Sequence, residues 1–157
     1  MRIMLTALLL PLLAGCATTS GPAAGWALVE GAISGERAGL VFGMPESDNV
    51  SMRIGCASAG TTLMVWTAPP RRGFAVATTG ATTISVLIDR REFRYAATLA
   101  QDHEGNWVAT AAVQDPAQFL PALRGVPRIA VVTHDGRNLV DVPAPALLDG
   151  FERACRS

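Results

Sequence analysis

From residue 26 onward, the chain is a succession of short apolar segments separated by turn residues, and this pattern constrains the fold more than any other feature. Alternation of apolar and polar side chains over four to eight residues is typical of half-buried β-strands. In residues 51–56, for example, Met52, Ile54 and Cys56 fall on one face. The expected strands are residues 26–30, 39–42, 51–56, 62–67, 82–88, 91–99, 107–113, 129–132 and 138–142. Short strands at this spacing predict a mainly β fold, an antiparallel sandwich or a barrel-like meander.

Two segments break the alternation and predict short helices. Asp115-Pro116 is a typical helix start, with Asp as the N-cap and Pro at the first position, and this helix should run to residue 123. Pro145 opens a second, C-terminal helix that should run through residue 156. Residues at helical spacing predict its buried face: Leu147, Leu148, Phe151, Ala154 and Cys155.

The chain contains three cysteines, Cys16, Cys56 and Cys155. If Cys16 is set aside for the reason given below, an even number remains, which predicts a disulfide in an exported protein. A Cys56–Cys155 bridge would close a loop of 155 − 56 + 1 = 100 residues, worth about 4.7 kcal/mol in the chain-entropy treatment. It would tie the final helix to an early strand. Two histidines and no Cys-x-x-Cys pair give no basis for a zinc site.

The N-terminus has the organisation of an export signal. Arg2 precedes an almost wholly apolar stretch at residues 3–13. As a helix this stretch would reach roughly 16 Å, whereas spanning the hydrocarbon core of a bilayer takes about 20 residues. The segment is therefore too short for a transmembrane helix and fits the apolar region of a signal peptide.

Leu13-Ala14-Gly15-Cys16 follows directly, and it resembles the lipobox of bacterial lipoproteins. The resemblance implies cleavage before Cys16 and acylation of its thiol, and two or more acyl chains hold a protein firmly at a membrane. Enteric lipoproteins retained at the inner membrane commonly carry Asp after the cysteine, so Ala17 implies the outer membrane, facing the periplasm. We therefore expect a signal peptide at residues 1–15, a lipidated cysteine and flexible tether at 16–25, and one β-rich domain at 26–157.

Charge and motifs exclude several classes of function. Removing Arg2 from 13 basic and 13 acidic side chains leaves a net charge near −1, without the basic surface that nucleic-acid binding requires. The sequence has no phosphate loop, dinucleotide fingerprint or Gly-x-Ser-x-Gly elbow. We expect no cofactor, no metal and no nucleic-acid partner.

A few polar segments remain as candidates for chemistry. His134-Asp135-Gly136 is a tight hairpin turn in which His and Asp could act as a base and its orienting group, although adjacent turn residues seldom face each other. His103 lies in a second polar turn. Residues 42–49 form a polar loop in which Glu46 and Asp48 could contact a cation or an arginine, or simply cap a turn. Two arginine clusters could form a cationic patch or solvated strand faces: Arg71-Arg72 and Arg90-Arg91-Arg94.

These observations favour an envelope lipoprotein with a non-enzymatic domain that binds an envelope protein or a glycan. One alternative is an envelope hydrolase with a site around His103 or His134. The other is a lysozyme inhibitor, because residues 56–66 are loosely similar to the opening strands of the small lipoproteins that inhibit lysozyme. The Ser-Gly-x-x-Tyr loop of that family has no counterpart here.

Overall fold

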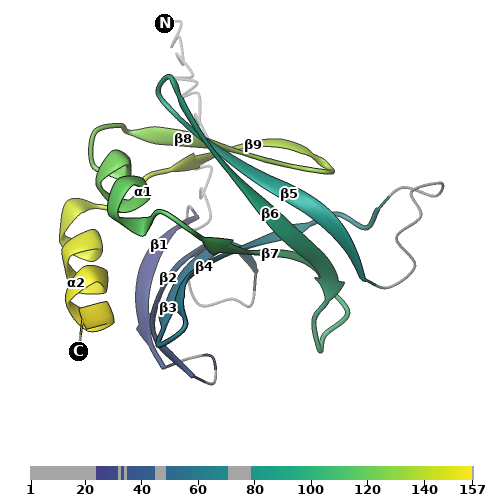
Figure 1. Cartoon of the computed structure of the whole chain (residues 1–157), viewed down its shortest axis with the longest axis horizontal. Coiled ribbons are helices and arrows are strands. Elements are labelled where there is room, and N and C mark those ends of the chain that lie inside the picture. The colour runs from purple at the N-terminus through teal and green to yellow at the C-terminus, as the bar shows by residue number, and fades with distance from the viewer. Residues whose placement is uncertain (1–23, 32, 34, 45–48, 71–78, 157) are drawn as a thin grey trace, which may run out of the picture.

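Nine antiparallel strands form one strongly curved, nearly closed barrel-like sheet, and two helices cover one end of it (Figure 1). The computed structural model describes residues 24–31, 33, 35–44, 49–70 and 79–156. The elements are β1 (Gly25–Glu30), β2 (Glu36–Gly43), β3 (Val50–Ala57), β4 (Gly60–Thr67), β5 (Thr79–Ile88), β6 (Arg91–Gln101), β7 (Trp107–Val113), α1 (Pro116–Leu123), β8 (Arg128–Thr133), β9 (Gly136–Asp141) and α2 (Pro145–Arg156). The predicted mainly β fold with a second, C-terminal helix is confirmed.

The strand order is β1-β2-β3-β4-β7-β6-β5-β8-β9. Most neighbours are joined by short turns, but β4 pairs with β7, so the chain must cross from β4 to β5 before the second meander begins. The edge strands β1 and β9 approach each other, because the indole N–H of Trp26 donates a hydrogen bond to the carbonyl of Asp141. This contact nearly closes the barrel.

The inward face of the sheet carries the alternating apolar residues that the sequence predicts. Leu40, Ile54 and Leu63 are cross-strand partners on β2, β3 and β4, and all three are fully buried. On β6, alternate residues are also buried: Phe93, Tyr95, Ala97 and Leu99. The hydrophobic core therefore lies inside the curved sheet.

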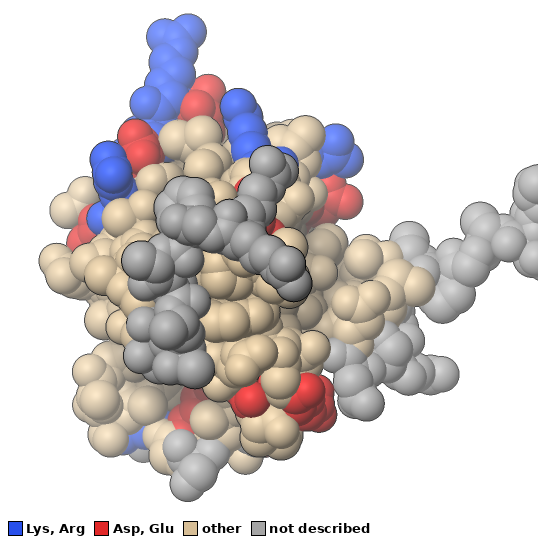
Figure 2. Space-filling view, turned by 90° about the vertical axis from the view of Figure 1, so that its right-hand side faces the viewer, with Lys and Arg blue, Asp and Glu red and all other residues tan. Residues whose placement is uncertain are grey.

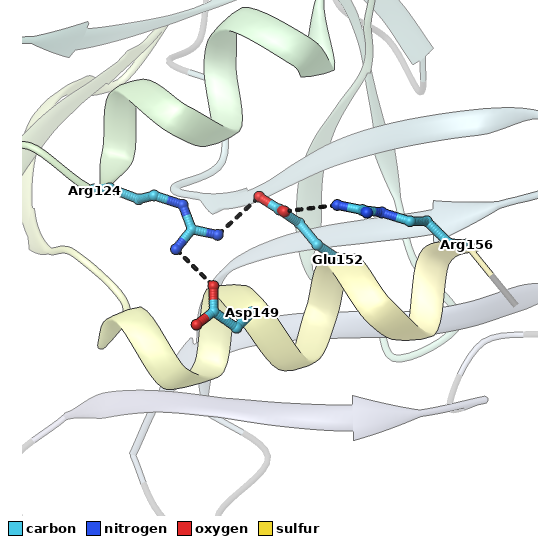
Figure 3. A network of polar contacts seen from close by, with 4 residues as sticks. All are labelled: Arg124, Asp149, Glu152 and Arg156. Atoms are coloured by element: carbon cyan, nitrogen blue, oxygen red, sulfur yellow. Dashed lines mark hydrogen bonds and ion pairs between the residues drawn. The ribbon is translucent and has the colours of Figure 1, made fainter.

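The two helices pack over the end of the barrel where β5 turns into β6 and β9 ends. Leu148 and Phe151 are the buried anchors of α2, and Phe119 of α1 meets the ring of Phe93 edge-on, with centroids 5.5 Å apart. Figure 3 shows the polar link between the helices: Arg124 contacts Asp149 at 2.7 Å and Glu152 at 3.0 Å, and Arg156 contacts Glu152 at 3.2 Å.

Asp115 is the N-cap residue of α1, as the sequence predicts. The helix does begin at Pro116, but the Asp115 carboxylate makes no capping hydrogen bond. It accepts a hydrogen bond from the hydroxyl of Tyr95 at 2.9 Å instead. The buried phenol needs a partner, and it takes the acceptor that would otherwise cap the helix.

The opposite end of the barrel carries the turns and is called the loop end below. The β6–β7 turn and the β8–β9 turn lie there, at the right of Figure 1, together with the segment that leaves β4. Figure 2 views the molecule from this side. Charged side chains gather at the upper and lower margins of that view, and the described surface between them is mostly uncharged.

Candidate functional site

A groove of about 460 Å3 lies at the loop end, where β4 and β7 terminate side by side. We call it the loop-end groove. The described residues that line it are Asn49, Val50, Trp66, Thr67, Pro69, Glu104, Gly105, Asn106 and Trp107. Its volume is in the range of small-molecule sites, and its mixture of aromatic and planar polar side chains is typical of them.

Trp66 and Trp107 are brought together by strand register. Thr67 pairs with Trp107 and Trp66 pairs with Val108, so the two tryptophans occupy diagonal positions at the end of the sheet. Successive residues alternate faces, which places Trp107 on the inward face with Ala109 and Trp66 on the outward face. A groove that passes over the end of the two strands therefore contacts both, and both side chains are only partly buried.

One wall of the groove is the β6–β7 turn, and Asp102 holds it in shape. The Asp102 carboxylate accepts hydrogen bonds from the backbone N–H groups of Glu104 and Asn106, both at 2.9 Å, and from the Asn106 side chain at 3.3 Å. The left-handed conformation of Gly105 (φ 84°) completes the turn. Burial disfavours the charged carboxylate, but these hydrogen bonds and one from the Trp66 side chain outweigh it and lower the pKa of Asp102.

A second, smaller cavity of about 280 Å3 lies between the inward faces of β2–β4 and the strands β8 and β9. Apolar residues such as Phe42, Met52 and Val140 line it together with the polar Ser51 and Asn138. Within it, no described lining residue is charged.

The β8–β9 turn binds the backbone that leaves β4, and it is not simply a solvated hairpin tip. Asp135 accepts a hydrogen bond from the N–H of Ala68 at 2.8 Å, and Nε2 of His134 lies 3.2 Å from the Ala68 carbonyl. A carbonyl only accepts, so Nε2 must carry the proton. Nδ1 of His134 is buried and has no hydrogen-bond partner among the described residues. Burial works against ionisation of Asp135, but hydrogen bonds from Thr133 and Ala68 and the charge interaction with His134 lower its pKa.

His103 lies in the β6–β7 turn with its side chain 90% exposed, and Nε2 is 3.7 Å from Glu104. The structure thus places the two histidines in different turns, one exposed and one holding backbone. His103 contacts Glu104 and His134 contacts the Ala68 carbonyl, and neither of these partners is a serine or cysteine nucleophile.

An ion pair that sequence reasoning missed lies on the outward face of β2 and β3. Arg53 and Glu36 form two hydrogen bonds, and their side chains are 8% and 6% exposed. The pair lies against bare backbone, because Gly39 and Gly55 are cross-strand partners beneath it. The available signal was two glycines inside expected strands, next to an arginine in an apolar run.

The predicted disulfide is present between Cys56 of β3 and Cys155 of α2, with Cα atoms 5.8 Å apart. It ties the C-terminal helix to an early strand, as expected. Cys16, the predicted lipidation site, lies outside the described residues, as do Glu46 and Asp48 and the arginines Arg71 and Arg72.

The other arginine cluster is at the β5–β6 turn. Arg90, Arg91 and Arg94 are all exposed. Arg91 lies over the ring of Phe93 at 4.9 Å and donates to Gln118 at 3.1 Å, so one of the three is engaged within the fold.

Within the described ranges, no group of three or more His, Cys, Asp or Glu side chains is placed to hold a metal ion. None of the described helices has the length and apolarity needed to span a membrane. No protein-family model, curated protein or solved structure matches the chain.

Proposed function

We propose that this chain is an envelope lipoprotein, anchored through Cys16 at the outer membrane and facing the periplasm, whose barrel-like domain binds a ligand in the loop-end groove without transforming it. The observation that carries the binding proposal is the groove itself. Two partly buried tryptophans lie beside a turn that Asp102 holds with a set of hydrogen bonds. A site held in shape before binding loses little entropy when its ligand arrives.

The proposed localisation and membrane anchor rest on other observations. Leu13-Ala14-Gly15-Cys16 resembles a lipobox, and the Cys56–Cys155 disulfide suits an oxidising compartment outside the cytoplasm. A tether at residues 17–24, before β1 begins at Gly25, has a root-mean-square reach of roughly 16 Å. The domain would therefore work close to the membrane surface.

The anchor is tested by comparing the full chain with Cys16→Ser in the native envelope. The expected result is that the parent protein fractionates with outer membranes and gains acyl mass on a chain that begins at Cys16. The serine variant should lose both properties. Equal membrane association of the two proteins would contradict the anchor.

The binding site is tested by photo-crosslinking in the same cells. A photoreactive residue at Glu104, in the groove, should label a discrete envelope component. The same residue at Glu92, which is exposed on β6 towards the helix end, serves as the matched control. Identical labelling from the two positions would contradict a site at the loop end.

A further inference from the structure

We infer that the ligand of the loop-end groove is a neutral oligosaccharide. This inference rests on the proposed binding function and goes further, because it names the chemical class that the groove can hold. The residues that argue for it come from three places in the chain: the start of β3, the end of β4 and the β6–β7 turn.

The described lining of the groove offers no positive charge to an anionic ligand. Glu104 is the only charged residue in the described lining, and its side chain is 53% exposed. The described lining residues include no arginine. At these described residues, a phosphate, a carboxylate or an anionic headgroup would meet the like charge of Glu104 and no cation. A neutral ligand has no such penalty.

The aromatic side chains provide surfaces for sugar rings. A pyranose has a face of C–H groups, which packs on an aromatic plane, and an edge of hydroxyls, which needs hydrogen-bonding partners. Trp66 and Trp107 supply the planes. Their indoles add large, rigid contact surface at low cost in side-chain entropy.

The polar side chains beside the tryptophans match the hydroxyl edge. The Glu104 carboxylate and the side-chain carbonyl oxygen of Asn106 accept hydrogen bonds, and the side-chain amide of Asn49 both donates and accepts them. Asn106 donates to Glu104 at 3.2 Å and to Asp102 at 3.3 Å, so the amide is already oriented. Aromatic planes next to fixed amide and carboxylate groups form a surface that recognises uncharged, hydroxyl-rich rings.

The three tryptophans of the chain allow a matched test by intrinsic fluorescence. Trp26 lies away from the groove, where it contacts the ring of Phe42 at 5.4 Å and donates to Asp141. Trp107→Phe and Trp66→Phe each remove one groove indole, and Trp26→Phe removes the same number of tryptophans elsewhere. The disulfide-bonded domain would be titrated with maltotriose and tri-N-acetylchitotriose, and with trigalacturonic acid as an anionic trisaccharide of equal length.

The expected result is saturable fluorescence change with at least one neutral trisaccharide, and at least about tenfold weaker binding of the anionic one. Both groove variants should weaken binding by about fivefold or more, which is the size expected for a lost stacking partner. Trp26→Phe should bind like the parent protein. Glu104→Ala gives a second test. Its side chain is exposed and lies in a turn, so this change leaves the packing of the strands intact. It should also weaken binding.

Several results would overturn the inference. They are no saturation with either neutral sugar, tighter binding of the anionic sugar, or equal loss in Trp26→Phe and the groove variants. Failure here is distinguishable from failure of the proposed function. If the sugars do not bind but crosslinking from Glu104 still labels a discrete component, the binding site stands and the ligand class is wrong.

Discussion

Arg53 of β3 and Glu36 of β2 form a nearly buried ion pair that lies directly on the backbone of two paired glycines, Gly39 and Gly55. A Cβ atom at Gly39 would lie 2.7 Å from Nη2 of Arg53, and one at Gly55 would lie 1.7 Å from Oε1 of Glu36. Glycine at these two positions therefore leaves the space that the charged groups occupy. Removing or displacing one partner of a buried pair leaves the other charge uncompensated.

We predict that Gly55→Ala destabilises the domain by about 3 kcal/mol or more, because the new methyl group displaces the Glu36 carboxylate from Arg53. Gly25→Ala on β1 is the matched control, since nothing lies within 4 Å of its added Cβ. That variant should change stability by no more than about 1 kcal/mol. The measurement is urea unfolding followed by circular dichroism, and similar midpoints for the two variants would refute the role assigned to the glycine.

Loss of the Cys56–Cys155 bridge should cost about 3–5 kcal/mol, since the cross-link constrains a long loop in the unfolded chain. The double variant Cys56→Ala/Cys155→Ala is compared with the parent protein under oxidising and reducing conditions. Reduction should lower the unfolding midpoint of the parent towards that of the variant and leave the variant unchanged. If reduction leaves the unfolding midpoint of the parent protein unchanged, the bridge does not stabilise the domain.

Much of the fold follows from the periodicity of the sequence. In β6, exposed and buried residues alternate from Glu92 to Leu99, and Pro145 marks the start of α2, so both elements were predictable from local pattern. The start of β2 at Glu36 was missed by three residues. A register shift between Glu36 and Ala38 interrupts the alternation there, which hides the strand from a two-residue pattern.

The candidate site was far less predictable. Trp66 and Trp107 are 41 positions apart, and only the pairing of β4 with β7 brings them together. Strand order is a tertiary property that one sequence does not reveal. Asp135 was predicted in a turn, but its contact with Ala68 depends on the crossing from β4 towards β5.

Tyr95 gives a prediction at alkaline pH. Burial, the hydrogen bond to Asp115 and the charge of that carboxylate raise the pKa of the phenol far above its ordinary value. In the unfolded chain the phenol ionises near pH 10, while the folded protein keeps it neutral. Its contribution to stability is therefore full below about pH 10 and declines as the pH rises towards the higher folded-state pKa.

Tyr95→Phe should lower stability by about 1–2 kcal/mol at neutral pH, because a hydrogen bond to a charged acceptor is lost. The variant should also lose less stability than the parent between neutral pH and about pH 11, since it lacks the titrating phenol. Urea midpoints measured at intervals over this range test both points. Parallel curves for the two proteins would contradict the role given to Tyr95.

The contact between Asp135 and Ala68 gives the corresponding prediction in acid. Because the pKa of Asp135 is lowered in the folded state, its stabilisation is present above the unfolded-state value of about 3.9 and disappears as the pH falls through the lower folded-state pKa. Asp135→Asn should cost about 0.5–1.5 kcal/mol at neutral pH. It should cost progressively less below about pH 4, where the parent carboxylate is also protonated. Glu92→Gln, at an exposed position on β6, is the control and should track the parent throughout. A cost for Asp135→Asn that stays constant down to about pH 2 would show that the carboxylate charge does not contribute to holding the β8–β9 turn against Ala68.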